Sequence, residues 1–147
     1  MILSLAIALG MYGVTLGVLM APTTLFIRIA TSRGQNDLTR PSYPMNVLVL
    51  QLAAALLFVS HLVNIALWAI LFCFCEEFEQ FEAAYYHSAV NYSSLGYGDV
   101  VMSPRWRLLG PLETVDGIVM FGISTALVFA LLDRMIARRL KDVNRSP

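Results

Sequence analysis

The chain has 147 residues, of which 58% are hydrophobic and 14% are charged, whereas soluble domains are about half apolar and a quarter charged. This balance excludes both a soluble fold and an intrinsically disordered chain. Ten basic and ten acidic residues give a formal net charge of zero, so no general basic surface indicates a nucleic-acid partner. We therefore expect a membrane protein whose surroundings are lipid.

The first predicted element is a membrane span at the N-terminus. Residues 1–27 contain no charged side chain, and about 20 apolar residues suffice to cross a bilayer. No basic residue precedes Arg28, and the apolar stretch is too long for the core of a signal peptide. We predict a retained transmembrane helix over residues 1–30, followed by a cytoplasmic loop over residues 31–44, which is rich in turn-forming residues.

Two further spans are predicted from uncharged runs. Residues 45–75 contain no Asp, Glu, Lys or Arg, which predicts a second span. Pro111 suits the first turn of a helix, and the apolar sequence after it predicts a third span over residues 111–136. Glu113 and Asp116 precede the uncharged part of this span, so we expect them at an interface or facing water or protein.

Charge asymmetry orients the predicted spans. Eight of the ten basic residues lie in the first loop or in the C-terminal segment, and an excess of Lys and Arg marks the cytoplasmic side. Three spans then place the N-terminus outside a plasma or inner membrane, with a cytoplasmic tail over residues 139–147. The eight residues are Arg28, Arg33, Arg40, Arg134, Arg138, Arg139, Lys141 and Arg145.

The segment over residues 78–99 is too polar to cross a membrane alone. Aromatic and small residues recur in it at helical spacing, and Ser-Ser-Leu-Gly-Tyr-Gly-Asp follows at residues 93–99. Irregular backbone at membrane depth is tolerated only where protein buries it or where it lines a water-filled path. We predict a re-entrant helix and a loop that lines a pore or cavity.

Residues 94–99, with the sequence SLGYGD, resemble the T-V-G-Y-G-D selectivity filter of the potassium channel pore-module family. The resemblance covers residues 45–138, as an outer helix over 45–75, a pore helix and filter over 78–99, and an inner helix over 111–136. It implies an all-α membrane protein with a homotetrameric pore, because one chain supplies one filter loop. The span over residues 1–30 has no counterpart in two-span members of the family.

Ion selectivity requires a particular backbone. Successive rings of carbonyl oxygen form only if alternate residues adopt positive φ, which glycine allows without strain; this predicts positive φ at Gly96 and Gly98. By resemblance, Ser94 supplies its carbonyl and hydroxyl to the innermost K⁺ site. Leu95, Gly96 and Tyr97 supply the carbonyl rings above it, with the Leu95 and Tyr97 side chains pointing backward into packing. K⁺ is the permeant ligand, and no cofactor is expected.

The filter departs from the family pattern at two positions, and the helix before it departs at one. Ser94 replaces the commoner Thr and Leu95 replaces Val, which motivates a weakly selective cation channel as an alternative. Val90 stands where some members carry a buried Glu that pairs with the Asp after the filter. Asp99 therefore needs another partner or solvent.

Tyr86, His87 and Asp99 are the predicted filter supports. Tyr86 and His87 align with two Trp residues in many relatives, one of which bonds the filter tyrosine. We hypothesise that Tyr86 or His87 bonds Tyr97 and that protonation of His87 tunes conduction. The alternative for His87 is an interfacial side chain in contact with water.

The inner helix offers a gating hinge. By resemblance, Gly122 lies at the family's hinge glycine, with Ser124 and Thr125 near the water-filled cavity. Glycine also allows close helix packing in membranes, and both roles can hold. In the second span, His61 and Asn64 lie one turn apart and serve either as interhelical hydrogen-bonding groups or as a sensor.

The predicted function is passive K⁺ conduction by a homotetramer. The alternatives are a weakly selective channel for monovalent cations and a non-conducting, channel-associated subunit. No nucleophile, acid–base pair or phosphate-binding loop indicates an enzyme. The two cysteines, Cys73 and Cys75, have no second pair or suitably spaced His with which to form a zinc site.

Overall fold

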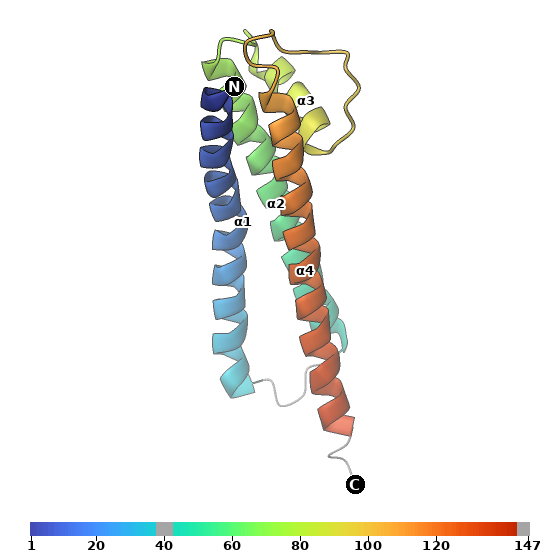
Figure 1. Cartoon of the computed structure of the whole chain (residues 1–147). Helices are drawn as coiled ribbons and strands as arrows, with labels where there is room; N and C mark the ends of the chain where they lie inside the picture. The colour runs from blue at the N-terminus through green and yellow to red at the C-terminus, as the bar shows by residue number, and fades with distance from the viewer. Residues whose placement is uncertain (38–42, 144–147) are drawn as a thin grey trace.

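The structure is a computed structural model that describes residues 1–37 and 43–143. It is all-helical over these residues, with three long helices and one short one (Figure 1), which confirms the predicted all-α membrane fold. The helices are α1 (Ile2–Asp37), α2 (Tyr43–Phe74), α3 (Phe81–Tyr92) and α4 (Leu109–Val143).

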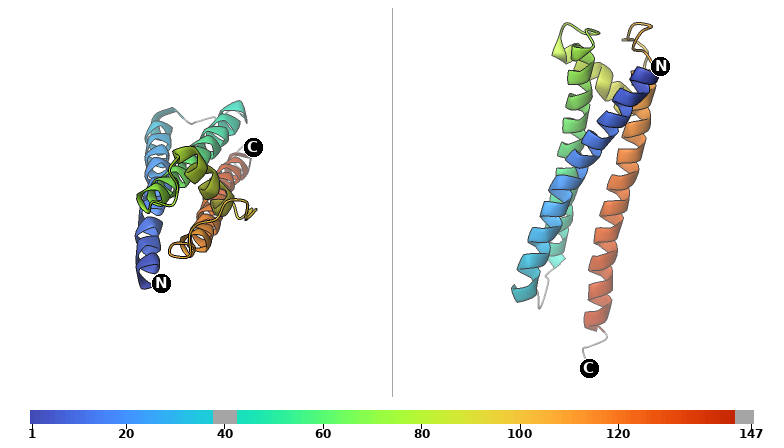
Figure 2. Two further views of the ribbon diagram at one scale, coloured as in Figure 1. Left: turned by 90° about the horizontal axis from the view of Figure 1, so that it is seen from above. Right: turned by 60° about the vertical axis from the view of Figure 1, so that its left-hand side comes forward.

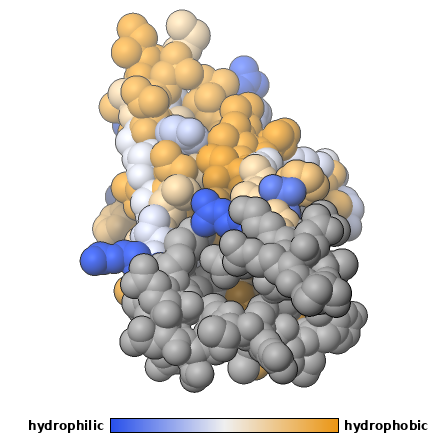
Figure 3. All heavy atoms as spheres, turned by 90° about the horizontal axis from the view of Figure 1, so that it is seen from below, coloured by the Kyte–Doolittle hydropathy of each residue, from blue (hydrophilic) through white to orange (hydrophobic). Residues whose placement is uncertain are grey.

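Three helices are long and apolar enough to cross a membrane, over Ile2–Leu25, Val47–Phe74 and Leu109–Ala137. Apolar side chains make up much of the described surface visible from below (Figure 3). Phe58 and Phe129, for example, are 63% and 70% exposed. Such exposure is unfavourable in water and costs nothing in hydrocarbon, so the chain is a multi-pass membrane protein.

The ends of the long helices differ from the predicted bounds. α1 continues to Asp37 and α2 begins at Tyr43, so the loop predicted over residues 31–44 is helical at both of its ends, and residues 38–42 lie outside the described part. Pro44 falls in the first turn of α2, where a missing N–H breaks no helical hydrogen bond.

α4 is also longer than predicted at both ends. It begins at Leu109 and continues to Val143, so the tail predicted over residues 139–147 is helical as far as it is described; residues 144–147 lie outside that part. Arg, Lys and Leu have high helix propensity and extend the helix beyond its apolar stretch.

α3 is a short helix held between α2 and α4 (Figures 1 and 2). It descends from the end of the bundle that carries the N-terminus, and the segment after it returns to that end (Figure 1). This is the predicted re-entrant arrangement. The buried core between the helices includes Trp68, Ala69 and Phe72 from α2, Ala84 and Tyr92 from α3, and Leu109 and Met120 from α4.

Gly117 sets the depth at which α3 ends. A Cβ atom at this position would lie 2.1 Å from the backbone carbonyl oxygen of Tyr92, the last residue of α3. Gly117 follows Leu109 by eight residues, or about 12 Å along the helix, so the end of α3 lies well inside the bundle. A Cβ at Gly122 meets nothing within 4 Å. Within one chain, Gly117 and not Gly122 is therefore the glycine that allows close helix packing.

We predict that Gly117→Ala destabilises the protein by about 1–3 kcal/mol, the usual cost of overpacking, because neither backbone can give way without moving a helix. The measurement is the unfolding midpoint in detergent. Gly122→Ala is the matched control, since the added methyl group has open space. Equal midpoints for the two variants would contradict this account of the contact.

Candidate functional site

The backbone after α3 alternates in conformation. Ser94, Gly96 and Gly98 have φ values of 64°, 58° and 71°, so positive φ recurs at every second residue. The two glycines adopt the conformation predicted for them. Ser94 adds a third position, where a side chain is present and left-handed backbone costs about 1–2 kcal/mol.

The last turn of α3 holds the beginning of this segment. The carbonyl oxygen of Val90 accepts hydrogen bonds from the amides of Leu95 (2.9 Å) and Gly96 (3.3 Å). The carbonyl oxygen of Asn91 accepts a bond from the Thr114 hydroxyl of α4 (2.9 Å). The negative end of the α3 dipole therefore faces the start of the segment, where it favours a cation.

The side chains of the segment lack cover within the chain. Leu95 is 57% exposed and Tyr97 is 65% exposed, although we predicted that both pack backward. Their packing partners therefore have to come from outside this chain or be absent.

Tyr86 and His87 contact the loop after the filter segment and not Tyr97. The Tyr86 hydroxyl donates to Asp99 Oδ2 (2.7 Å), and His87 Nδ1 lies 2.9 Å from the carbonyl oxygen of Val100. Within one chain neither residue bonds Tyr97, because the returning loop places residues 99 and 100 beside α3; a bond from Tyr86 or His87 to Tyr97 stays a prediction. Val90 replaces the Glu that pairs with this Asp in some family members, and Asp99 bonds Tyr86 instead.

The pKa values of all three groups are shifted, two of them by the hydrogen bond between Tyr86 and Asp99 and that of His87 by burial. The Tyr86 hydrogen bond lowers the pKa of Asp99 and raises the pKa of Tyr86 itself, so Asp99 is ionised at neutral pH. Burial lowers the pKa of His87, and its ring lies against Phe72 and Phe78. His87 is therefore neutral at pH 7.

The tautomer of His87 follows from its neighbours. A carbonyl oxygen only accepts, so Nδ1 carries the proton and donates to Val100. Nε2 then accepts from Asn91 Nδ2, 2.9 Å away. Protonation of Nε2 would place two donors against each other and turn the Asn91 amide.

Two carboxyl groups of α4 are buried against protein. Glu113 is fully buried and Asp116 is 4% exposed, so of the surroundings that the sequence allowed, protein is the one observed. Glu113 Oε1 accepts from the Ser88 hydroxyl of α3, whose oxygen also lies 2.8 Å from the carbonyl oxygen of Ile65. In the sequence, both carboxyl groups stood out because they lie just before the uncharged part of the span. The sequence did not show which residues they bond.

His61 and Asn64 link helices, which is the first of the two roles weighed for them. His61 lies 3.1 Å from the Tyr92 hydroxyl through Nδ1 and 2.9 Å from the Ser124 hydroxyl through Nε2. Asn64 Nδ2 donates to the Tyr92 hydroxyl (3.2 Å). One polar cluster thus ties α2 to the end of α3 and to α4.

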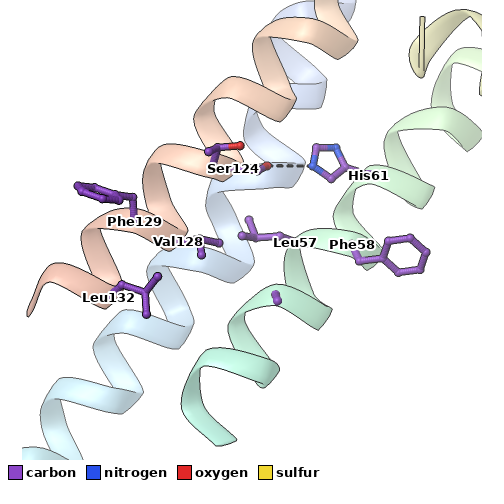
Figure 4. Close-up of a pocket in the computed structure, with 9 residues that line it drawn as sticks. Leu57, Phe58, His61, Ser124, Val128, Phe129 and Leu132 are labelled. Atoms are coloured by element: carbon purple, nitrogen blue, oxygen red, sulfur yellow. Dashed lines mark hydrogen bonds between the residues drawn. The ribbon is translucent and has the colours of Figure 1, made fainter. Parts of the chain in front are cut away.

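The predicted cavity residues of α4 differ in their surroundings. Ser124 is buried against α2 and points toward His61 (Figure 4). Thr125 is exposed, and its hydroxyl donates to the carbonyl oxygen of Phe121 in its own helix. Both residues line an apolar groove of ≈470 Å³ between α2 and α4 that includes Leu57 and Val128.

Comparison with known proteins gives the family. A family model described as "Ion channel" matches residues 52–134, which include α3, the filter segment and most of α2 and α4. The chain therefore belongs to this ion channel family, whereas the whole of α1 lies outside the match. No curated protein and no solved structure matches the chain.

We predict that Tyr86→Phe raises the pKa of Asp99, because the variant removes the hydrogen bond that stabilises the carboxylate. Carboxyl ¹³C resonances followed through a pH titration measure this pKa. Tyr85→Phe is the control, since the Tyr85 hydroxyl lies near the Leu62 carbonyl oxygen and not near Asp99. An unchanged Asp99 titration in Tyr86→Phe would show that the bond does not form in the membrane.

Proposed function

We propose that this ion channel conducts K⁺ selectively through a filter built from residues 94–98. The observation that carries the proposal is the alternating positive φ at Ser94, Gly96 and Gly98, directly after a re-entrant helix whose negative end faces the segment. A backbone of this kind turns successive carbonyl oxygens toward one path, where they replace the water around an ion.

The proposed ion sites use backbone oxygen. The Ser94 carbonyl and hydroxyl form the innermost site, and the carbonyls of Leu95, Gly96 and Tyr97 form the rings above it. Both ends of the segment have an anchor. The Val90 carbonyl bonds fix the inner end, and the bond between Tyr86 and Asp99 fixes the outer end.

The functional unit that we propose is a homotetramer. One chain contributes one strand of carbonyls, and a ring around an ion needs several. The exposure of Leu95 and Tyr97 in a single chain supports neighbouring chains as their cover. Closed rotational symmetry then brings four identical segments to a common axis.

The orientation that we propose places the N-terminus and the filter segment outside the cell membrane. Both lie at one end of the bundle, and α4 ends at the other (Figure 1). Most basic residues of the described ranges lie toward this second end, which the positive-inside rule assigns to the cytoplasm.

A weakly selective channel for monovalent cations is the second candidate function. Ser94 lacks the methyl group that restricts the Thr rotamer, and Leu95 changes the volume behind the carbonyls. A looser filter would hold its oxygens at a less uniform spacing and discriminate less between K⁺ and Na⁺.

Protonation of His87 remains a proposed modulator of conduction. Because burial lowers its pKa, the change in flux is expected in acid, below the ordinary histidine value of about 6.5. The groups whose charges act on the ring are Asp99 and Glu77. The pH dependence of flux should flatten in His87→Gln; an identical profile would remove this role.

We predict that liposomes containing the purified protein release K⁺ far faster than Na⁺ and that Gly96→Ala abolishes the flux. Gly96 has φ +58° with open space around it, so the added methyl group acts by straining the backbone and not by a clash. Gly10→Ala is the control, because that glycine also has open space but shows no positive φ. Equal K⁺ and Na⁺ fluxes would favour the weakly selective channel, and no flux would favour a non-conducting subunit.

A further inference from the structure

The helix that the family match does not explain carries a buried polar residue. α1 runs obliquely across α2 and α4 (Figure 2) and packs against both. Thr15, near its middle, is fully buried. Its hydroxyl oxygen lies 3.0 Å and 3.1 Å from the two carboxylate oxygens of Asp116 in α4.

Asp116 joins three helices at one point. Besides the Thr15 hydroxyl of α1, its Oδ2 accepts a hydrogen bond from Trp68 Nε1 of α2 (2.8 Å), and the Trp68 side chain is fully buried. A carboxyl group enclosed in a membrane protein depends on such donors, because neither water nor lipid supplies them. Loss of the Thr15 hydroxyl would leave Asp116 with Trp68 alone.

The contacts of Thr15 with other helices lead to the end of the pore helix; within α1, its hydroxyl oxygen also lies 3.0 Å from the carbonyl oxygens of Met11 and Tyr12. Asn64 Nδ2 donates to the Thr15 backbone carbonyl (3.3 Å) and to the Tyr92 hydroxyl (3.2 Å). Asp116 immediately precedes Gly117, which lies against the Tyr92 backbone carbonyl. Tyr92 stands two residues before Ser94, where the proposed filter begins.

We infer that α1 is a working part of the conduction pathway, in which Thr15 is a positioning residue that fixes Tyr92, and with it the filter segment, through Asp116 and Asn64. The inference rests on the proposed function of residues 94–98. It gives the extra helix a role, because Thr15 of α1 supplies a hydrogen-bonding partner to Asp116 of α4.

The physical consequence concerns local opening of the filter. Tyr92 anchors the last turn of α3, whose Val90 carbonyl holds the Leu95 and Gly96 amides. If Thr15 no longer restrains Tyr92, these two bonds open more often. An ion that binds only the closed filter opposes that opening by mass action, so more K⁺ is needed to keep the filter formed.

Amide hydrogen exchange of Leu95 and Gly96, in lipid nanodiscs and at several K⁺ concentrations, is the direct test. In Thr15→Val, which keeps the shape of the side chain and removes the hydroxyl, we expect exchange of both amides to rise by about three- to tenfold, the size of one lost hydrogen bond. Added K⁺ should reverse the rise. Thr15→Ser retains the hydroxyl and should restore slow exchange.

Thr24→Val is the matched control. Thr24 also belongs to α1, but it is exposed, and its hydroxyl donates to the Ala21 carbonyl of the same helix. A purely structural role for Thr15 would speed exchange in α1 and leave Leu95 and Gly96 unchanged. That result would overturn the inference, as would an equal rise in Thr24→Val.

Trp68→Phe supplies a second route if Thr15→Val does not assemble. It removes the other donor to Asp116 and leaves α1 intact, and it should also speed exchange of Leu95 and Gly96; unchanged exchange would contradict the role of Asp116. Exchange is measured without conduction. A wild-type protein that carries no K⁺ flux would therefore refute the proposed function separately from the coupling of Thr15 to the filter segment.

Discussion

The structure depends on the rule that a chain in a bilayer has to satisfy its polar groups within the protein. The backbone groups of the three long helices are satisfied within each helix. The polar side chains of α3 and the irregular backbone after it need partners from elsewhere in the protein. Their polar groups find partners on the helices around them. Ser88 bonds Glu113 and the carbonyl of Ile65, and the Tyr92 hydroxyl lies between His61 and Asn64. Hydrogen bonds, as well as apolar packing, therefore set the position of α3.

The same rule bears on the irregular backbone after α3, which lies inside the bundle. The absence of a Cβ at Gly117 lets α3 approach α4 closely at about 12 Å from the start of that helix. The chain then has to leave the helix at this depth, and the carbonyl of Val90 accepts the amides that would otherwise lack partners. Gly117 thus sets where α3 ends, and the Val90 carbonyl holds the backbone that follows. Together they position the segment that we propose as the filter.

Local features were predictable from the sequence, and long-range pairings were not. Uncharged runs identified the three spans, and the spacing of Gly96 and Gly98 identified their backbone conformation. Helix ends were less accurate, because the turn-forming residues at positions 31–37 did not end α1, which continues to Asp37. The partners of Tyr86 and His87 within the chain were not predicted, since nothing local showed that Asp99 and Val100 return to α3.

Thr15 and Asp116 are the clearest example of a pairing that the sequence alone could not predict. They are separated by 101 positions in the sequence, and each residue taken alone is only a polar side chain in an apolar helix. Their pairing required knowledge of how α1 crosses α4. The exposure of Leu95 and Tyr97 belongs to the same class of property, because their cover depends on chains other than this one.

The central claim is that the backbone oxygens of residues 94–97 bind K⁺ in preference to Na⁺. Carbonyl ¹³C labelling of Leu95 and Gly96, with the protein in lipid and titrated first with K⁺ and then with Na⁺, measures this directly. The account predicts resonances that shift and saturate with K⁺ and that shift weakly or only at much higher concentration with Na⁺. Equal responses to the two ions would contradict selectivity, and no response to either would contradict an ion site at this backbone.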